Sequence, residues 1–146
     1  MAKLSKEQSK IQIDYWTNLA KRDCETMEGL FKIKRYPESL FFAHIVLEKI
    51  LKAHVVHATH EVAPKIHDLT RLSELANYGD LLSEEDEIVL DSANKYNIRA
   101  RYPDYKLRFY KEYNANPGYV REKLDQIIKI YQLLCQNLKQ RIKLKK

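Results

Sequence analysis

The chain has 146 residues, enough for one domain to bury a hydrophobic core without disulfides or a metal. It contains only three Gly and four Pro, and this scarcity of turn residues argues against a strand-rich fold. The net charge is +6, but every charge after Asp125 is positive, so a well-capped C-terminal helix end is the simpler explanation of the excess and a polyanion-binding patch is the alternative.

Two long helices are predicted in the first 60 residues. Residues 5–8 have the pattern of a capping box, and an apolar seam with 4-3 spacing follows, which predicts a helix over residues 6–31. The seam consists of Trp16, Ala20, Asp23, Met27 and Leu30. Pro37 suits the first turn of a second helix, which extends to about residue 60. This second helix is apolar on nearly all sides, so we expect it to be the central, most buried one.

Three further helices are predicted downstream. A short helix carries Leu69, Leu72 and Leu75 and is closed by residues 77–79, where Gly79 can take a left-handed conformation. The next helix is capped by Ser83 and ends near residue 102, because Pro103 stops it. The last helix extends from residue 117 to about residue 143. The last seam consists of Val120, Leu124, Ile127, Tyr131, Leu134 and Leu138.

These elements predict an all-α fold in a single domain over residues 1–146. Short connections make sequential helices neighbours, so we expect an up-and-down antiparallel bundle of four long helices and one short helix. The apolar circumference of the second helix and the wide apolar face of the last one exceed what a small monomeric bundle needs. A homodimer is therefore predicted.

Cysteine spacing and hydropathy restrict the setting. Cys24 and Cys135 are far apart in the sequence and form no C-x-x-C pair, which argues against a metal site or a redox pair. The N-terminus lacks the apolar segment of a secretion signal, and no apolar run is long enough to span a bilayer. We expect a cytoplasmic protein that does not enter the membrane.

Polar residues on the second helix form two patterns. His44, Glu48 and Lys52 recur every four residues, so the carboxylate can pair with either neighbour. A stripe facing solvent is the simplest interpretation; pairing at a helix or subunit interface and a nucleotide or RNA site are the alternatives.

The second pattern is the run His54, His57 and His60. Its successive steps rotate in one direction around the helix, so three imidazoles cannot easily converge on one ion. We expect exposed histidines and no metal, although one pair, or His57 with Glu61, could chelate one.

Asp23 lies on the apolar seam of the first helix. An unpaired ionised carboxylate there would destabilise the fold substantially, because its desolvation is not compensated. We expect this carboxylate to pair with a cation or to cap a helix, and a functional role is the alternative.

Residues 99–119 mix basic and aromatic side chains. The members are Arg99, Arg101, Lys106, Arg108 and Lys111 together with Tyr102, Tyr105, Phe109, Tyr110, Tyr113 and Tyr119. Rings stack on bases and cations neutralise phosphates, so this composition is typical of a site for single-stranded nucleic acid or a nucleotide. A loop packed down by its own tyrosines explains the composition equally well.

Three stretches, taken in order, are similar to a known family. They are FFAHIVLEKILKA at residues 41–53, IHDL at residues 66–69 followed by Leu72, and RARYPD at residues 99–104. Together they resemble the HEPN family of prokaryotic nucleotide-binding helical domains, and Trp16, Ala20 and Asp23 also look like that family's first helix. The resemblance covers nearly the whole chain. It implies a dimerising cytoplasmic bundle that frequently works with a small nucleotidyltransferase in toxin-antitoxin-like or RNA-related systems.

The sequence departs from the family's ribonuclease members in one respect. Those members carry an arginine, a gap of four to six residues and a histidine, and this pair positions and protonates phosphodiester oxygens. In this chain Arg35 comes nearest, with a longer gap before His44, and no histidine follows His67. Ribonuclease activity is therefore in doubt, and binding is favoured over catalysis.

The leading hypothesis is a dimeric nucleotide- or RNA-binding accessory protein that acts with a nucleotidyltransferase, without a cofactor or metal. Its site is predicted to contain the following residues: Arg99, Arg101, Tyr102 and Lys106, lined by Glu48, Lys52 and His67. One alternative is a metal-independent ribonuclease that uses Arg101 and His67. The other is a non-catalytic protein-interaction module.

Overall fold

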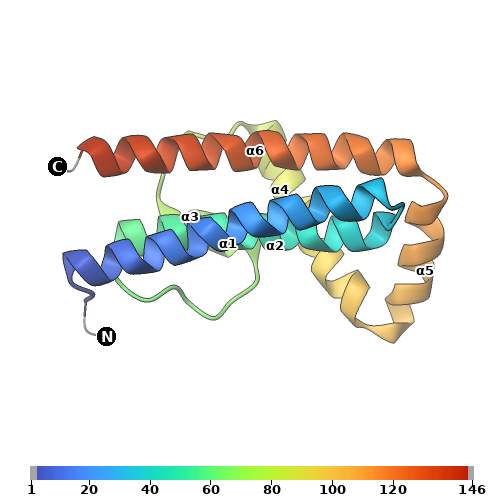
Figure 1. Ribbon diagram of the computed structural model, residues 1–146, viewed down its shortest axis with the longest axis horizontal. Coiled ribbons are helices and arrows are strands. Elements are labelled where there is room, and N and C mark those ends of the chain that lie inside the picture. The colour runs from blue at the N-terminus through green and yellow to red at the C-terminus, as the bar shows by residue number, and fades with distance from the viewer. Residues whose placement is uncertain (1–2, 145–146) are drawn as a thin grey trace.

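The computed structural model describes residues 3–144, except for the side chains at positions 98–101, 103 and 104. Within this range the chain forms six helices and no strands, which confirms the all-α prediction (Figure 1). The helices are α1 (Lys6–Lys32), α2 (Tyr36–Thr59), α3 (Leu69–Ala76), α4 (Glu84–Arg101), α5 (Pro103–Asn114) and α6 (Pro117–Leu144).

The α1–α2 hairpin begins with the predicted capping box. The Gln8 backbone N–H donates to Ser5 Oγ at 3.0 Å, and the Ser5 backbone N–H donates to Gln8 Oε1 at 2.8 Å. The turn between the helices contains Lys34 in a left-handed conformation, with φ of 66°. Pro37 occupies the first turn of α2, as predicted, and His60 caps its C-terminus in a left-handed conformation.

Helix α2 is the centre of the fold, as its composition predicted. It packs against α1, α3, α4, α5 and α6, and its apolar residues are buried nearly all round. Helix α6 runs in the same direction as α2 and opposite to α1, so the start of α1 and the end of α6 lie at the same end of the bundle (Figure 1). Because neighbouring helices enclose α2, its apolar circumference does not itself require a second copy of the chain.

One helix was missed by the sequence analysis. Residues 103–114 form α5, which lies across the far end of the bundle and contacts α2, α4 and α6 (Figure 1). Pro103 was interpreted only as the end of the preceding helix, but proline is equally compatible with the first turn of a new one.

The end of α3 also differs from the prediction. Asn77, with φ of 50°, is its left-handed C-cap, and Gly79 takes a positive φ two residues later. Asparagine tolerates this conformation because its short polar side chain can bond locally.

The described helices include none with both the length and the apolar character needed to cross a bilayer.

Candidate functional site

The stripe on α2 is buried, so the prediction that it faces solvent was wrong. His44 is 1% exposed, Lys52 6% and Glu48 9%. On one side the Lys52 amine lies 5.2 Å from the centre of the Trp16 ring of α1. On the other, the stripe is bonded to His67, which precedes α3. The cover comes from elements distant in sequence, which is why helix periodicity alone did not reveal it.

Glu48 is hydrogen-bonded to two other members of this buried cluster. Its Oε2 accepts from Lys52 Nζ at 3.0 Å, and its Oε1 accepts from His67 Nδ1 at 3.0 Å. The carboxylate thus has a cation on one side and an imidazole on the other, which offsets the cost of removing it from water. The pairing that the sequence offered as one alternative is the arrangement observed.

His67 is held at two points. Its backbone carbonyl accepts from His44 Nε2 at 2.9 Å, and its ring Nδ1–H donates to Glu48. A ring that donates through Nδ1 presents Nε2 as the nitrogen available to a ligand. The side chain is 53% exposed, so this nitrogen can be reached from outside. The buried cluster therefore fixes the orientation of an accessible imidazole.

Asn94 of α4 is hydrogen-bonded to the start of α3, next to His67. Its Oδ1 accepts from the Leu69 backbone N–H at 2.8 Å, and its Nδ2 donates to Asp68 Oδ1 at 3.2 Å. Asp68 is itself the N-cap of α3 and accepts from the Thr70 backbone N–H at 3.0 Å. These bonds lock the loop before α3 against α4.

A pocket of about 560 Å³ opens between these two elements. We call it the His67 pocket; it is lined by His67, Asp68, Thr70, Asp91, Asn94 and Asn97. Every lining side chain is polar, and together they offer hydrogen-bond donors and acceptors at fixed positions. The sequence analysis missed Asp91, Asn94 and Asn97, although their three-residue spacing places them near one another on α4.

The predicted site residues separate into two groups. Glu48, Lys52 and His67 are brought together, as described above. Tyr102 and Lys106 are exposed at the α4–α5 junction, where the Lys106 amine lies 5.6 Å from the centre of the Tyr110 ring. The side chains of Arg99 and Arg101 lie outside the described residues.

The rings of the aromatic segment divide into buried and exposed ones. Phe109 and Tyr113 of α5 are buried against Tyr96 of α4, with ring centres 6.5 and 6.3 Å away from the Tyr96 ring. Tyr102 and Tyr105 remain exposed. Some tyrosines therefore build the core of the α4–α5 corner, and others are available at its surface.

Two of the three histidines in the run are buried, contrary to the prediction that they are exposed. His54 and His57 are buried, and only His60 is accessible. His54 Nε2 donates to the Leu134 carbonyl of α6 at 2.7 Å, and its Nδ1 lies 3.2 Å from Nη1 of Arg141. Burial lowers the pKa of His54 to about 4, with smaller contributions from Arg141 and His57. Among residues 3–144 as described, no three His, Cys, Asp or Glu side chains are grouped to hold a metal.

Asp23 is paired with a cation, as the sequence analysis expected. Its carboxylate accepts from Lys49 Nζ of α2 in a partly buried ion pair. The pair lies where α1 packs on α2, so the polar position on the apolar seam is structural, and the prediction of a pairing interaction is confirmed.

Comparison with known proteins gives one match. A family model described as the HEPN domain matches residues 13–140, which includes most of α1, all of α2 to α5 and most of α6. No curated protein and no solved structure matches the chain. The family match covers most of the sequence and agrees with the helical architecture. This chain belongs to the HEPN domain family.

Proposed function

We propose that the protein is a dimeric nucleotide- or RNA-binding accessory protein that acts with a nucleotidyltransferase in a toxin-antitoxin-like or RNA-related system. Membership of the HEPN family supports a nucleotide- or RNA-related role. The observation that carries the proposal is the His67 pocket, where buried side chains hold polar groups in place at an accessible surface. Such preorganisation favours binding because little ordering remains to be done when the ligand arrives.

The composition of the pocket favours the base and ribose part of a ligand. Asn94 and Asn97 supply amide donors and acceptors, and His67 supplies a ring nitrogen, which suit base edges and sugar hydroxyls. Asp91 would repel a phosphate at this point. We therefore assign the phosphate to the C-terminal end of α4, where Arg101 follows Asn97 by four residues, the spacing of one helix face.

The neighbouring residues complete the proposed site. Tyr102 is exposed for stacking on a base, and Lys106 adds a positive charge one turn further along, in α5. Arg99 lies on the last turns of α4 with Arg101 and would add to the positive potential. Glu48 and Lys52 act indirectly, by holding His67.

A homodimer is part of the proposal. The α6 surface retains a set of half-buried, mainly apolar side chains that α1 and α2 do not fully cover: Ile128, Tyr131 and Cys135. A second copy of the chain would remove this strip from water.

The test measures binding of labelled single-stranded RNA by fluorescence anisotropy, and of nucleotides by calorimetry. We expect Asn97→Ala and Arg101→Ala each to weaken binding by about 1–3 kcal/mol, the size of hydrogen bonds to charged or well-placed groups. Arg101→Lys should restore only part of the loss, because lysine lacks the bidentate geometry. Arg22→Ala, an exposed arginine on α1, is the matched control.

Circular dichroism of the same variants separates binding from folding. If Arg101→Ala lowers the melting temperature and leaves RNA and nucleotide affinity unchanged, the arginine is structural. The protein-interaction module would then be the better hypothesis, and co-purification with a nucleotidyltransferase would test it.

The contact between Glu48 and His67 favours a second candidate, the metal-independent ribonuclease. A carboxylate that accepts from Nδ1 of a histidine orients Nε2 as a general base. In RNA, His67 Nε2 would take the 2′-hydroxyl proton and the 2′-oxygen would attack the phosphorus. The bond from phosphorus to the 5′-oxygen would break, and this oxygen would take a proton from water, giving a 2′,3′-cyclic phosphate and a free 5′-hydroxyl. Arg101 would stabilise the charge on the phosphorus oxygens.

Cleavage of single-stranded RNA in the presence of a chelator tests this candidate. Activity that survives EDTA, requires the 2′-hydroxyl and is lost in His67→Gln would establish it, and Glu48→Gln should then reduce turnover more than substrate affinity. His60→Asn is the control, because His60 is accessible but lies away from the His67 pocket. No cleavage above the level of His67→Gln excludes it and leaves binding as the function.

A further inference from the structure

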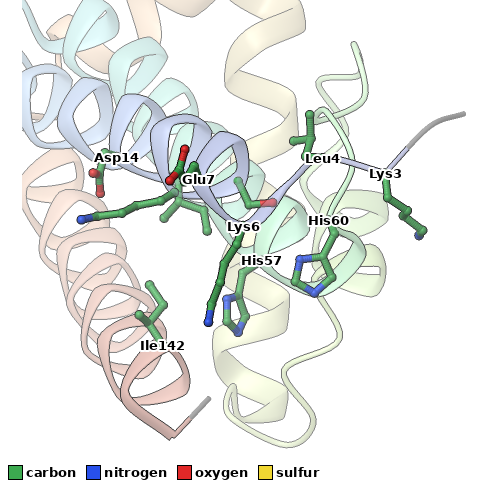
Figure 2. Close-up of a pocket in the computed structure, with 11 residues that line it drawn as sticks. Lys3, Leu4, Lys6, Glu7, Asp14, His57, His60 and Ile142 are labelled. Atoms are coloured by element: carbon green, nitrogen blue, oxygen red, sulfur yellow. The ribbon is translucent and has the colours of Figure 1, made fainter. Parts of the chain in front are cut away.

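A larger pocket, separate from the His67 pocket, lies at the end of the bundle where α1 begins and α2 and α6 end (Figure 2). Its volume is about 840 Å³, and it shares no lining residue with the His67 pocket. Sites of about 300–1,000 Å³ are the usual size for small organic ligands. We call it the Lys6 pocket.

The walls of the Lys6 pocket are fixed by the chain itself. The Leu4 backbone N–H donates to the His60 carbonyl at 2.6 Å, and Lys3 Nζ donates to the Thr59 carbonyl at 2.8 Å. These bonds attach the segment before α1 to the last turn of α2. The pocket is therefore formed without a ligand.

The pocket combines an apolar lining with three lysines, of which Lys3 is already bonded to the Thr59 carbonyl. Leu4, Ile13 and Ile142 supply the apolar surface, and no Phe, Tyr or Trp is among the described residues that line it. Lys6 and Lys10 are four residues apart on α1, so both lie on the face toward the pocket. Figure 2 shows the Lys6 amine extending between His57 and Ile142.

Lys6 and Lys10 have no ion pair among the described residues, which leaves both of these amines available for an anion. Glu7 and Asp14 also line the pocket, but neither carboxylate lies within ion-pair distance of them. The pocket also lies at the N-terminus of α1, where the helix dipole adds positive potential. An anionic group is thus favoured at this side of the pocket.

Ser9 gives an independent indication of a ligand. It lines the pocket, is only 5% exposed, and its Oγ has no hydrogen-bond partner within the described part of the chain. Buried hydroxyls in native proteins nearly always have a partner, and an orphaned one destabilises the fold. A ligand oxygen in the pocket could accept a hydrogen bond from this hydroxyl.

We propose that the Lys6 pocket binds a single-chain anionic amphiphile, with its alkyl chain against Leu4, Ile13 and Ile142 and its carboxylate at Lys6, Lys10 and Ser9. The lack of aromatic rings disfavours a nucleobase, which would gain from stacking. The apolar lining disfavours a small, fully polar anion, because it would leave that surface without a partner. A fatty acid has both an alkyl chain for the apolar side chains of the pocket and a carboxylate for its lysines.

The experiment uses the full chain and dodecanoate, below the concentration at which it forms micelles, with isothermal titration calorimetry as the readout. Dodecyltrimethylammonium, which has the same chain and a positive head, is the ligand control. We expect one dodecanoate per chain and no comparable binding of the cation. Lys6→Gln combined with Lys10→Gln should weaken dodecanoate binding by about tenfold or more, and Ser9→Ala by about threefold.

The matched control variant combines Lys21→Gln and Lys32→Gln, which removes two exposed lysines of α1 that do not line the pocket. It should bind dodecanoate like the unmodified protein. Equal binding of the two detergents, an unchanged affinity in the Lys6 and Lys10 double variant, or binding to anionic vesicles without binding of monomeric dodecanoate would each overturn the proposal. Circular dichroism of each variant confirms that the fold is retained.

Discussion

Acidification is expected to destabilise the protein through His54. The side chain is fully buried between α2 and α6, where its Nε2 donates to the Leu134 carbonyl and the Tyr78 ring packs 5.5 Å from it. Desolvation lowers its pKa to about 4 in the folded protein. Because the unfolded chain has an ordinary histidine with a pKa of about 6.5, the two states differ in proton affinity.

The sign and size of the effect follow from these two pKa values. Above about pH 6.5 the imidazole is neutral in both states, so it imposes no pH dependence. As the pH is lowered from about 6.5 to 4, the unfolded chain takes up a proton that the folded protein does not. The free energy of unfolding therefore decreases as the pH is lowered. The total loss is about 3 kcal/mol by pH 4, since each pKa unit corresponds to about 1.4 kcal/mol.

The assay is urea denaturation followed by circular dichroism, at fixed ionic strength and several pH values between 7.5 and 4. His54→Gln keeps an amide that can donate to the Leu134 carbonyl but does not titrate. We expect the pH dependence of its unfolding free energy to be smaller than that of the unmodified protein by about 3 kcal/mol across this range. Carboxylates that titrate in the same pH range affect both proteins equally, so their contribution cancels when the two unfolding free energies are subtracted.

Parallel curves of unfolding free energy against pH for the two proteins would refute the reasoning. That result would mean that the folded protein accepts a proton on His54 at no cost, which contradicts its burial and its proximity to Arg141.

The remaining predictions concern folding and assembly. Leu47→Asp should prevent folding, because it places an unpaired charge at a fully buried position of α2; unchanged circular dichroism would contradict this. Asn94→Ala should lower the unfolding free energy by about 1–2 kcal/mol in urea titrations, because the Leu69 N–H loses its acceptor; no change would exclude that role. Lys34→Gly should raise stability by up to about 1 kcal/mol by relieving the left-handed backbone, and a lower melting temperature would argue against it. Light scattering should give twice the chain mass, and a monomer at all concentrations would rule out the proposed homodimer.

Much of the helical architecture could be predicted because its determinants are local. The capping box at Ser5, the first-turn proline at Pro37 and the seam of α6 depend on residues a few positions apart. One detail of that seam differs, since Ile130 is fully buried and Tyr131 only half-buried. The error at α5 arose because Pro103 fits both the end of one helix and the start of another.

The candidate site was only partly predictable, for a physical reason. Helix periodicity tells which residues share a face, so it correctly grouped His44, Glu48 and Lys52. It does not tell what covers that face. The bond between Glu48 and His67 joins residues 19 positions apart, and it depends on how the loop before α3 folds back. The contribution of Asn94 was hidden for the same reason, because its partners lie on that loop.

The placement of α2 has a consequence for synthesis on the ribosome. Its closest early neighbour is α1, joined to it by residues 33–35, so this hairpin is built from contacts close in sequence and can form as soon as both helices have emerged. Helix α6, which covers another side of α2, is made last. Until then the nascent chain exposes part of its most apolar helix, so chaperone binding and aggregation should both be most pronounced for chains that stop before residue 117.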